Sequence, residues 1–147
     1  FLKDMLGDVL FTKALHYYIG EWNGKHPMPY DFFNCINAGS GRNLNWFWKR
    51  WFFDNGAPNL AITKILQKRN EYAAVIESKG TKPVPVDLTV FFEDGTHLFL
   101  HRDVSVWQYG NKAISISFST KKIVKKLVLG SMHIPDSDKS DNVYMMK

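Results

Sequence analysis

The sequence contains a single cysteine, and this scarcity excludes one way of holding a fold together. Cys35 has no second cysteine with which to form an internal disulfide bond. Its neighbours along the chain are Phe32, Phe33 and Ile36, which indicates a small buried apolar side chain. A nucleophilic cysteine would need a histidine partner, and no sequence pattern supplies one.

Long apolar runs are absent as well. No run approaches the ~18 residues that a membrane-spanning helix requires, so we predict no membrane segment. No internal repeat or low-complexity segment is found, and no feature points to one cellular compartment. The chain opens at Phe1, already within a helical pattern and without a methionine, which indicates the edge of a fragment of a longer protein.

Metal-binding and catalytic motifs are also missing. No HExxH helix occurs, and the histidines are scattered along the chain: His16, His26, His97, His101 and His133. His97 and His101 share one face of an expected strand, but a spacing of four residues is ~13 Å, too far to share an ion. We therefore predict no catalytic residue, no metal ligand and no cofactor site within this chain.

Other charged or glycine-containing stretches lack the pattern of a site. Gly41, Arg42 and Asn43 have neither the spacing of a phosphate loop nor a strand before them. The adjacent carboxylates Glu93 and Asp94 fall in an expected turn, where they do not form an acid–base pair in a cleft. Neither stretch is a candidate catalytic or phosphate-binding site.

A basic run raises the question of nucleic-acid binding. Net charge is +5, and four lysines lie close together near the C-terminal end: Lys121, Lys122, Lys125 and Lys126. Along a strand these side chains divide between two faces, and no aromatic platform or helix-in-groove motif accompanies them. Lysines that protect an exposed strand edge explain the run equally well, so we predict no nucleic-acid partner.

Large apolar side chains are abundant in the sequence. Hydrophobic residues make up 45% of the chain and aromatic residues 15%, which is enough to build a core. The first helix is expected from Leu2 to Trp22, with two apolar faces. Leu2, Met5, Leu6 and Val9 form one face, and the nearly opposite face holds Phe11, Ala14, Leu15, Tyr18 and Trp22. Two such faces predict neighbours on both sides of the helix.

Two shorter helices follow. The second is expected from Pro29 to about Ala38, with Gly39 as its stop signal. The third is expected to begin at the N-cap Asn43 and to end at Gly56, before Pro58. Its wide apolar face holds Leu44, Phe47, Trp48, Trp51 and Phe52, and the far side carries Trp46 and Phe53.

The pattern changes after Pro58 from helical to alternating and β-branched. We predict about seven short strands that form an antiparallel β-sandwich, with turns at Asp94-Gly95 and Gly110-Asn111. The expected strands are 60–66, 72–77, 86–92, 97–104, 113–118, 122–129 and an edge strand at 143–145. The predicted fold class is α+β, a three-helix segment followed by a fibronectin/Ig-like antiparallel β-sandwich.

The order of these elements resembles the gluzincin aminopeptidases, the zinc-dependent aminopeptidase N family. The resemblance rests on "LGDVLFTKALHYYIGEW", on "HPMPYDFFNCINAGSGRNLNWFWKRWFFDNGAPNL" and on "PVPVDLTVFFEDG", and is strongest over residues 26–60. The matching positions are Leu6-Gly7 with Phe11, Asp31-Phe32-Phe33, Ser40-Gly41 with Asn43-Leu44, Trp51, and Gly56 with Pro58. Asn43 replaces the family's usual Asp, and both residues cap a helix well.

This resemblance implies two domains. Residues 1–58 would be the helical C-terminal part of a metallopeptidase catalytic domain, and residues 59–147 the β-sandwich domain. The family's zinc ligands, its general-base Glu and its Tyr lie N-terminal to the matched segment. The parent would remove N-terminal residues from peptides with zinc as cofactor, whereas this 147-residue chain alone is expected to be inactive.

The resemblance also implies partners. These are the rest of the parent metallopeptidase chain and, through the parent, peptide substrates; cut from the parent, helix faces such as that of Leu2 and Val9 are expected to self-associate. Two alternatives remain open: a non-catalytic aminopeptidase-like scaffold, and a β-sandwich module that binds other proteins. The residues of this chain alone do not separate the scaffold from an active enzyme, whereas the two apolar faces of the helices argue against the binding module.

Overall fold

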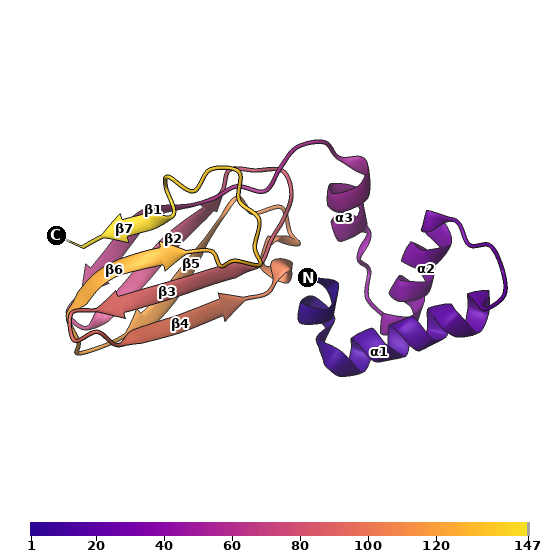
Figure 1. Cartoon of the computed structure of the whole chain (residues 1–147), viewed down its shortest axis with the longest axis horizontal. Helices are drawn as coiled ribbons and strands as arrows, with labels where there is room; N and C mark the ends of the chain where they lie inside the picture. Colours follow the sequence, from indigo (N-terminus) through magenta and orange to yellow (C-terminus); the bar gives the residue numbers. More distant parts are fainter. Residues whose placement is uncertain (147) are drawn as a thin grey trace. The chain divides into compact units, whose positions relative to one another are not determined.

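A computed structural model describes residues 1–146 of the chain. They form two compact units, one from Phe1 to Asp54 and one from Asn55 onward. The first unit contains the helices α1 to α3, and the second contains the strands β1 to β7 (Figure 1). Three α-helices followed by two antiparallel sheets confirm the predicted α+β class. None of the described helices is long and apolar enough to cross a bilayer.

Helix α1 has the predicted bounds, Leu2–Trp22, but it is not straight. Gly7 leaves helical geometry, with φ of 73° and ψ of 163°, a region that is nearly closed to residues with a Cβ. The chain therefore changes its helical phase at Gly7. Leu6 lies before this point and Ala14 after it, and both are buried.

The kink at Gly7 divides the single apolar face that was expected from Leu2 to Val9. Val9 follows the kink and is 82% exposed, whereas Leu6 before it is 9% exposed. Two apolar faces in the sequence thus reflect two helical segments of different phase, not a straight helix with neighbours on both sides.

Helix α2 covers Pro29–Ser40 and ends two residues later than predicted. At its start, the backbone N–H of Met28 donates to the Asp31 carboxylate at 2.8 Å. The left-handed residue that ends the helix is Gly41, with φ of 66°, so the expectation that Gly39 stops it was wrong.

Gly39 has a different role, because it is where α2 comes closest to α1. A Cβ placed on Gly39 would lie 2.7 Å from the Ala14 Cα and 2.9 Å from the Tyr17 Cβ. Ala14 is fully buried at this contact. The two helices can approach this closely only because both residues are small.

Helix α3 is shorter than predicted. It covers Asn45–Trp48, and the chain then continues as a π-helical turn over Lys49–Phe53. The N–H of Asp54 donates to the Lys49 carbonyl five residues earlier, at 2.9 Å. The backbone becomes extended at Asp54, so the helix does not continue to Gly56 as predicted.

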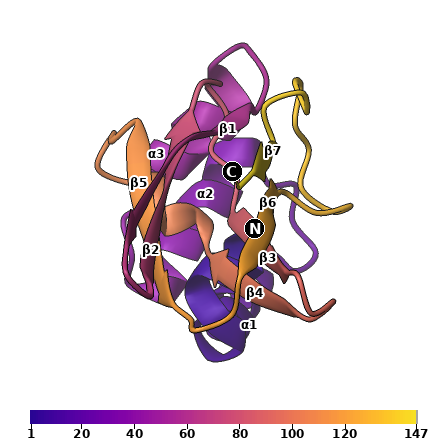
Figure 2. The same ribbon diagram turned by 90° about the vertical axis from the view of Figure 1, so that its left-hand side faces the viewer.

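The second unit contains seven strands among the described residues, all paired antiparallel in two sheets. One sheet has the order β1-β2-β5 and the other the order β4-β3-β6-β7, and Figure 2 shows them as separate layers. The bounds are β1 Leu60–Lys68, β2 Glu71–Ser78, β3 Val86–Phe92, β4 His97–Arg102, β5 Ala113–Ser119, β6 Val124–Leu129 and β7 Val143–Met145.

Alternating apolar side chains from both sheets form the buried core of this unit. Ile76 of β2, Leu88 of β3 and Ile116 of β5 are fully buried. The predicted strand 97–104 ends earlier, at Arg102, and a short 3₁₀ turn follows over Val104–Trp107. Trp107 is buried by this turn, and its indole N–H donates to the Val84 carbonyl at 2.9 Å.

The strand order shows where the lysines of the basic run lie relative to the sheet edges. β6 lies between β3 and β7, so lysines on it do not protect a sheet edge, contrary to the prediction. The edge strands are β1 and β5 in one sheet and β4 and β7 in the other. β1 carries a bulge between Ile62 and Lys64.

Two glycines of the helical unit should respond to alanine in opposite ways. G39A should destabilise the helical unit by ~1–3 kcal/mol, since the added methyl group would overlap Ala14. G20A lies within α1 with no atom within 4 Å of the new Cβ, and should stabilise by ~1 kcal/mol. Urea unfolding followed by helical circular dichroism measures both. A G39A variant as stable as G20A would refute the close contact.

Candidate functional site

Residues 1–146 contain no group of three or more His, Cys, Asp or Glu side chains placed to hold a metal ion. The histidines that the sequence analysis considered do not gather in space as a ligand set, and all five are exposed: His16, His26, His97, His101 and His133. Cys35 is 8% exposed, which confirms its assignment as a buried apolar side chain.

One histidine has a buried carboxylate as its partner. Asp87 of β3 is 8% exposed, and its Oδ1 lies 2.7 Å from Nδ1 of His101. The two residues face each other across the β3–β4 pairing. A buried carboxylate is costly without a partner, so His101 has a structural role in keeping Asp87 within the sheet.

One of the two turn carboxylates, that of Asp94, also has a structural role. Asp94 lies in the β3–β4 turn and accepts hydrogen bonds from the Thr96 N–H at 2.9 Å and the Thr96 hydroxyl at 2.6 Å. The Lys122 ammonium group is 2.9 Å from the same carboxylate. The hydrogen bond from Lys122, together with those from Thr96, lowers the pKa of Asp94 to about 2.

Two of the four lysines in the basic run therefore already have neighbours within the fold. Lys122 binds Asp94 and the Thr96 hydroxyl, and Lys126 places its ammonium group 5.1 Å from the centre of the Phe91 ring. Lys121 and Lys125 are exposed. The run is not a continuous patch of free cations.

Aromatic side chains form the centre of the helical unit. Phe33 of α2 stacks on Trp48 of α3, with ring centres 4.8 Å apart and planes at 20°. The Trp48 indole N–H donates to Asn37 Oδ1 at 3.0 Å, and the same oxygen accepts the Leu44 N–H at 3.3 Å. Asn37 thereby joins the end of α2 to the start of α3.

Part of this aromatic cluster remains exposed. Tyr30 is 60% exposed, Phe52 is 60% exposed and Phe53 is 52% exposed. Tyr30 and Phe53 stack on each other with ring centres 5.5 Å apart. We name Tyr30, Phe52 and Phe53 the aromatic surface; a contiguous apolar patch of this kind is typical of an interaction site.

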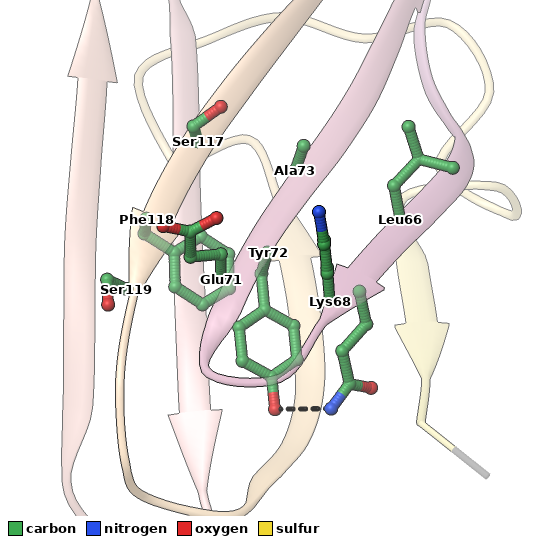
Figure 3. Close-up of a pocket in the computed structure, with 9 residues that line it drawn as sticks. Leu66, Lys68, Glu71, Tyr72, Ala73, Ser117, Phe118 and Ser119 are labelled. Carbon is green, nitrogen blue, oxygen red and sulfur yellow. Dashed lines mark hydrogen bonds between the residues drawn. The ribbon is translucent and has the colours of Figure 1, made fainter.

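The second unit has a hollow of about 530 Å³ at the β1–β2 hairpin end of its first sheet (Figure 3). Tyr72 and Phe118 form its apolar part, stacked with planes 5° apart. The Tyr72 hydroxyl accepts a hydrogen bond from the Gln67 amide at 2.9 Å. Its other lining residues are Leu66, Lys68, Glu71, Ala73, Ser117 and Ser119.

The sequence analysis did not identify this hollow. Its residues come from three strands and carry no motif. The available signal was the regular Ile/Phe–Ser alternation of residues 114–119, which placed serines on one face. It could not show that the hairpin would leave an open space beside Phe118.

Removing the Lys122 side chain should raise the pKa of Asp94 from about 2 toward 3.8, because the hydrogen bond that lowers this pKa most is lost. A folded-state pKa below the ordinary value stabilises the fold above about pH 4, and this stabilisation is lost as the pH falls toward 2. NMR titration of the Asp94 carboxyl carbon in K122A measures the shift. K125A, which removes a lysine with no bond to Asp94, serves as the control; an unchanged titration in K122A would contradict the prediction.

Comparisons with known proteins agree with this architecture. No family model matches the chain. A relative, aminopeptidase N of Haemophilus influenzae, is 25% identical over 113 residues, which cover 69% of this chain and 13% of the relative. A crystal structure of Legionella pneumophila aminopeptidase A in complex with aspartic acid superposes with a TM-score of 0.62 at 20% identity, over 87% of this chain and 15% of that one.

The sequence identities and coverages show how much this chain shares with these proteins. The solved structure supports the same fold, and the chain spans only 13% of the length of its curated relative. The match extends over most of this chain, in agreement with the resemblance found in its helical and strand segments. The chain is related to the aminopeptidase family.

Proposed function

We propose that this chain is a C-terminal structural portion of a zinc-dependent, gluzincin-type metallo-aminopeptidase. In this proposal residues 1–58 are the helical end of the catalytic domain, and residues 59–147 are a β-sandwich domain of fibronectin/Ig type. The parent protein removes N-terminal residues from peptides. The residues described here support the catalytic domain and take no part in the reaction.

The aromatic surface is the observation that carries this proposal. Each buried aromatic side chain removes ~150–250 Å² from water, and Tyr30, Phe52 and Phe53 leave more than half of theirs exposed. A longer chain of the kind to which this one is related provides residues that can cover them. The relationship to aminopeptidase N supports the same assignment.

The described residues do not fit a zinc ion. No group of three ligand side chains exists among residues 1–146, and the histidine with a close carboxylate, His101, is already bonded to the buried Asp87. The proposal therefore assigns zinc ligands only to residues outside this chain, and it gives no residue here a part in the chemistry of the metal.

Two other functions belong to different classes. A non-catalytic aminopeptidase-like scaffold would keep this architecture after losing its zinc ligands elsewhere. A β-sandwich module that binds proteins would use a surface of the second unit, and one sheet edge of that unit has the features for it.

The coding sequence upstream of Phe1 tests the proposal directly. We expect it to encode HExxH, a later Glu ligand and a Tyr shortly before the described segment. Other residues at the positions of these zinc ligands would favour the scaffold. A reading frame whose start codon lies immediately before Phe1 would refute the proposal. As a biochemical complement, the 147-residue chain with added zinc should not hydrolyse a fluorogenic aminoacyl amide, and hydrolysis that follows the chain through purification would also refute it.

The aromatic surface should make the separate chain self-associate. Replacing Phe52 and Phe53 together by serine should weaken this association about tenfold or more, since large aromatics contribute most at such contacts. Sedimentation velocity over a range of concentrations measures it. Ile123→Ser removes an even more exposed apolar side chain from the second unit and should leave association unchanged. A monomeric wild-type chain at high concentration would contradict the prediction.

A further inference from the structure

Strand β5 presents a free backbone edge, and its pairing with β2 shows which groups are free. The Ser78 N–H donates to the Lys112 carbonyl at 2.8 Å, and the Thr120 N–H donates to the Asn70 carbonyl at 2.9 Å. Backbone groups alternate in direction along a strand, so the even-numbered residues between these bonds face β2. The N–H and C=O groups of Ser115, Ser117 and Ser119 point to the open side.

The four sheet edges of the second unit differ in their protection. β1 has a bulge and carries lysines, and its Ile62 N–H donates to the Asp141 carbonyl. β4 carries two histidines and an arginine, and β7 is three residues long. These are the usual devices that keep other strands from pairing with an edge.

β5 has none of these devices along its length. It is seven residues long, "AISISFS", without charge, proline or bulge. Its outward residues Ser115, Ser117 and Ser119 are all exposed. An edge of this kind is suited to pairing with an added extended segment, in which main-chain hydrogen bonds supply the affinity.

Lysines flank this neutral strand at both ends. Lys112 precedes it, and Lys121 follows it after one intervening residue; both are exposed. No ion pair holds Lys112 or Lys121 among residues 1–146, whereas the next lysine, Lys122, is bound to Asp94. The edge therefore has a neutral middle and a free positive charge at each end.

The hollow shown in Figure 3 reaches this edge. Ser117, Phe118 and Ser119 of β5 form one side of it, and its apolar wall is the stacked pair of Tyr72 and Phe118. A strand added along β5 would carry a side chain past the mouth of this space. An open volume of about 530 Å³ can receive a large aromatic or aliphatic group.

We propose that the β5 edge binds an extended segment of a partner protein, neutral and β-branched along its middle, with a large apolar side chain for the hollow and carboxylates at both ends. The segment adds a strand beside β5 and bonds to the outward groups of Ser115, Ser117 and Ser119. Its carboxylates lie near Lys112 and Lys121. This proposal depends on the second unit alone and does not rest on the proposed parent activity.

A second copy of this chain fits the edge less well. Antiparallel pairing of two β5 strands about Ser117 would bring Lys112 of one copy beside Lys121 and Lys122 of the other. Parallel pairing would place each lysine beside its own equivalent. Like charges opposite each other destabilise a strand pair, so the charges favour an acidic partner.

The test is amide hydrogen exchange by NMR on the whole 147-residue chain. The probe is a synthetic peptide as long as β5, with alternating threonine and valine, a tyrosine near one end and glutamates at both ends. We expect the peptide to slow exchange at Ser115, Ser117 and Ser119. Ile114 and Ile116, already bonded to β2, should change little. Unchanged exchange at the three serines at saturating peptide would overturn the proposal.

Charge reversal tests the chemistry of the partner. Replacing Lys112 and Lys121 together by glutamate should weaken binding of the glutamate peptide about tenfold, and K125E, an exposed lysine on the other sheet, should leave it unchanged. A lysine-flanked peptide that bound wild type equally well would overturn the proposed charge. Protection of the three serines by increasing protein concentration alone would identify a second copy as the occupant and overturn the proposal.

Discussion

The stack of Phe33 on Trp48 is the interaction on which the helical unit depends. Phe33 also lies within about 6 Å of four other aromatic rings, those of Tyr30, Phe32, Phe52 and Phe53. A single side chain of α2 thus connects this helix to α3 and to the π-helical turn. Because so many rings meet at one point, those at the margin cannot all be covered by 54 residues. The exposed aromatic surface is a direct result of this arrangement.

The second unit covers its apolar core with its own residues. Its inward side chains alternate along each strand, so the two sheets cover each other's apolar faces. What remains incompletely satisfied is backbone: among residues 1–146, the outward N–H and C=O groups of β5 have no strand beside them. The two units therefore differ in the kind of surface they leave open, aromatic side chains in one and peptide groups in the other.

Sequence periodicity predicted most of this fold because local rules dominate it. β3 and β7 have the predicted bounds, and the other strands differ at their ends, because alternation and turn residues act over short distances. The kink at Gly7 and the role of Gly39 were not predicted, since a glycine in a helical pattern does not show whether it bends the chain or admits a neighbour. The edge position of β5 and the hollow beside Phe118 also needed the strand order, which no single segment encodes.

The π-helical turn at Lys49–Phe53 has a consequence for comparing this chain with its relatives. Hydrogen bonds that span five residues instead of four accommodate one more residue than an α-helix in the same turn. A relative with an ordinary helix here would therefore align with a single-residue gap between Lys49 and Phe53. Across that gap, the residues before and after it would keep equivalent positions. The length of this short segment in a relative therefore shows whether the π-helical turn that carries Phe52 and Phe53 is kept.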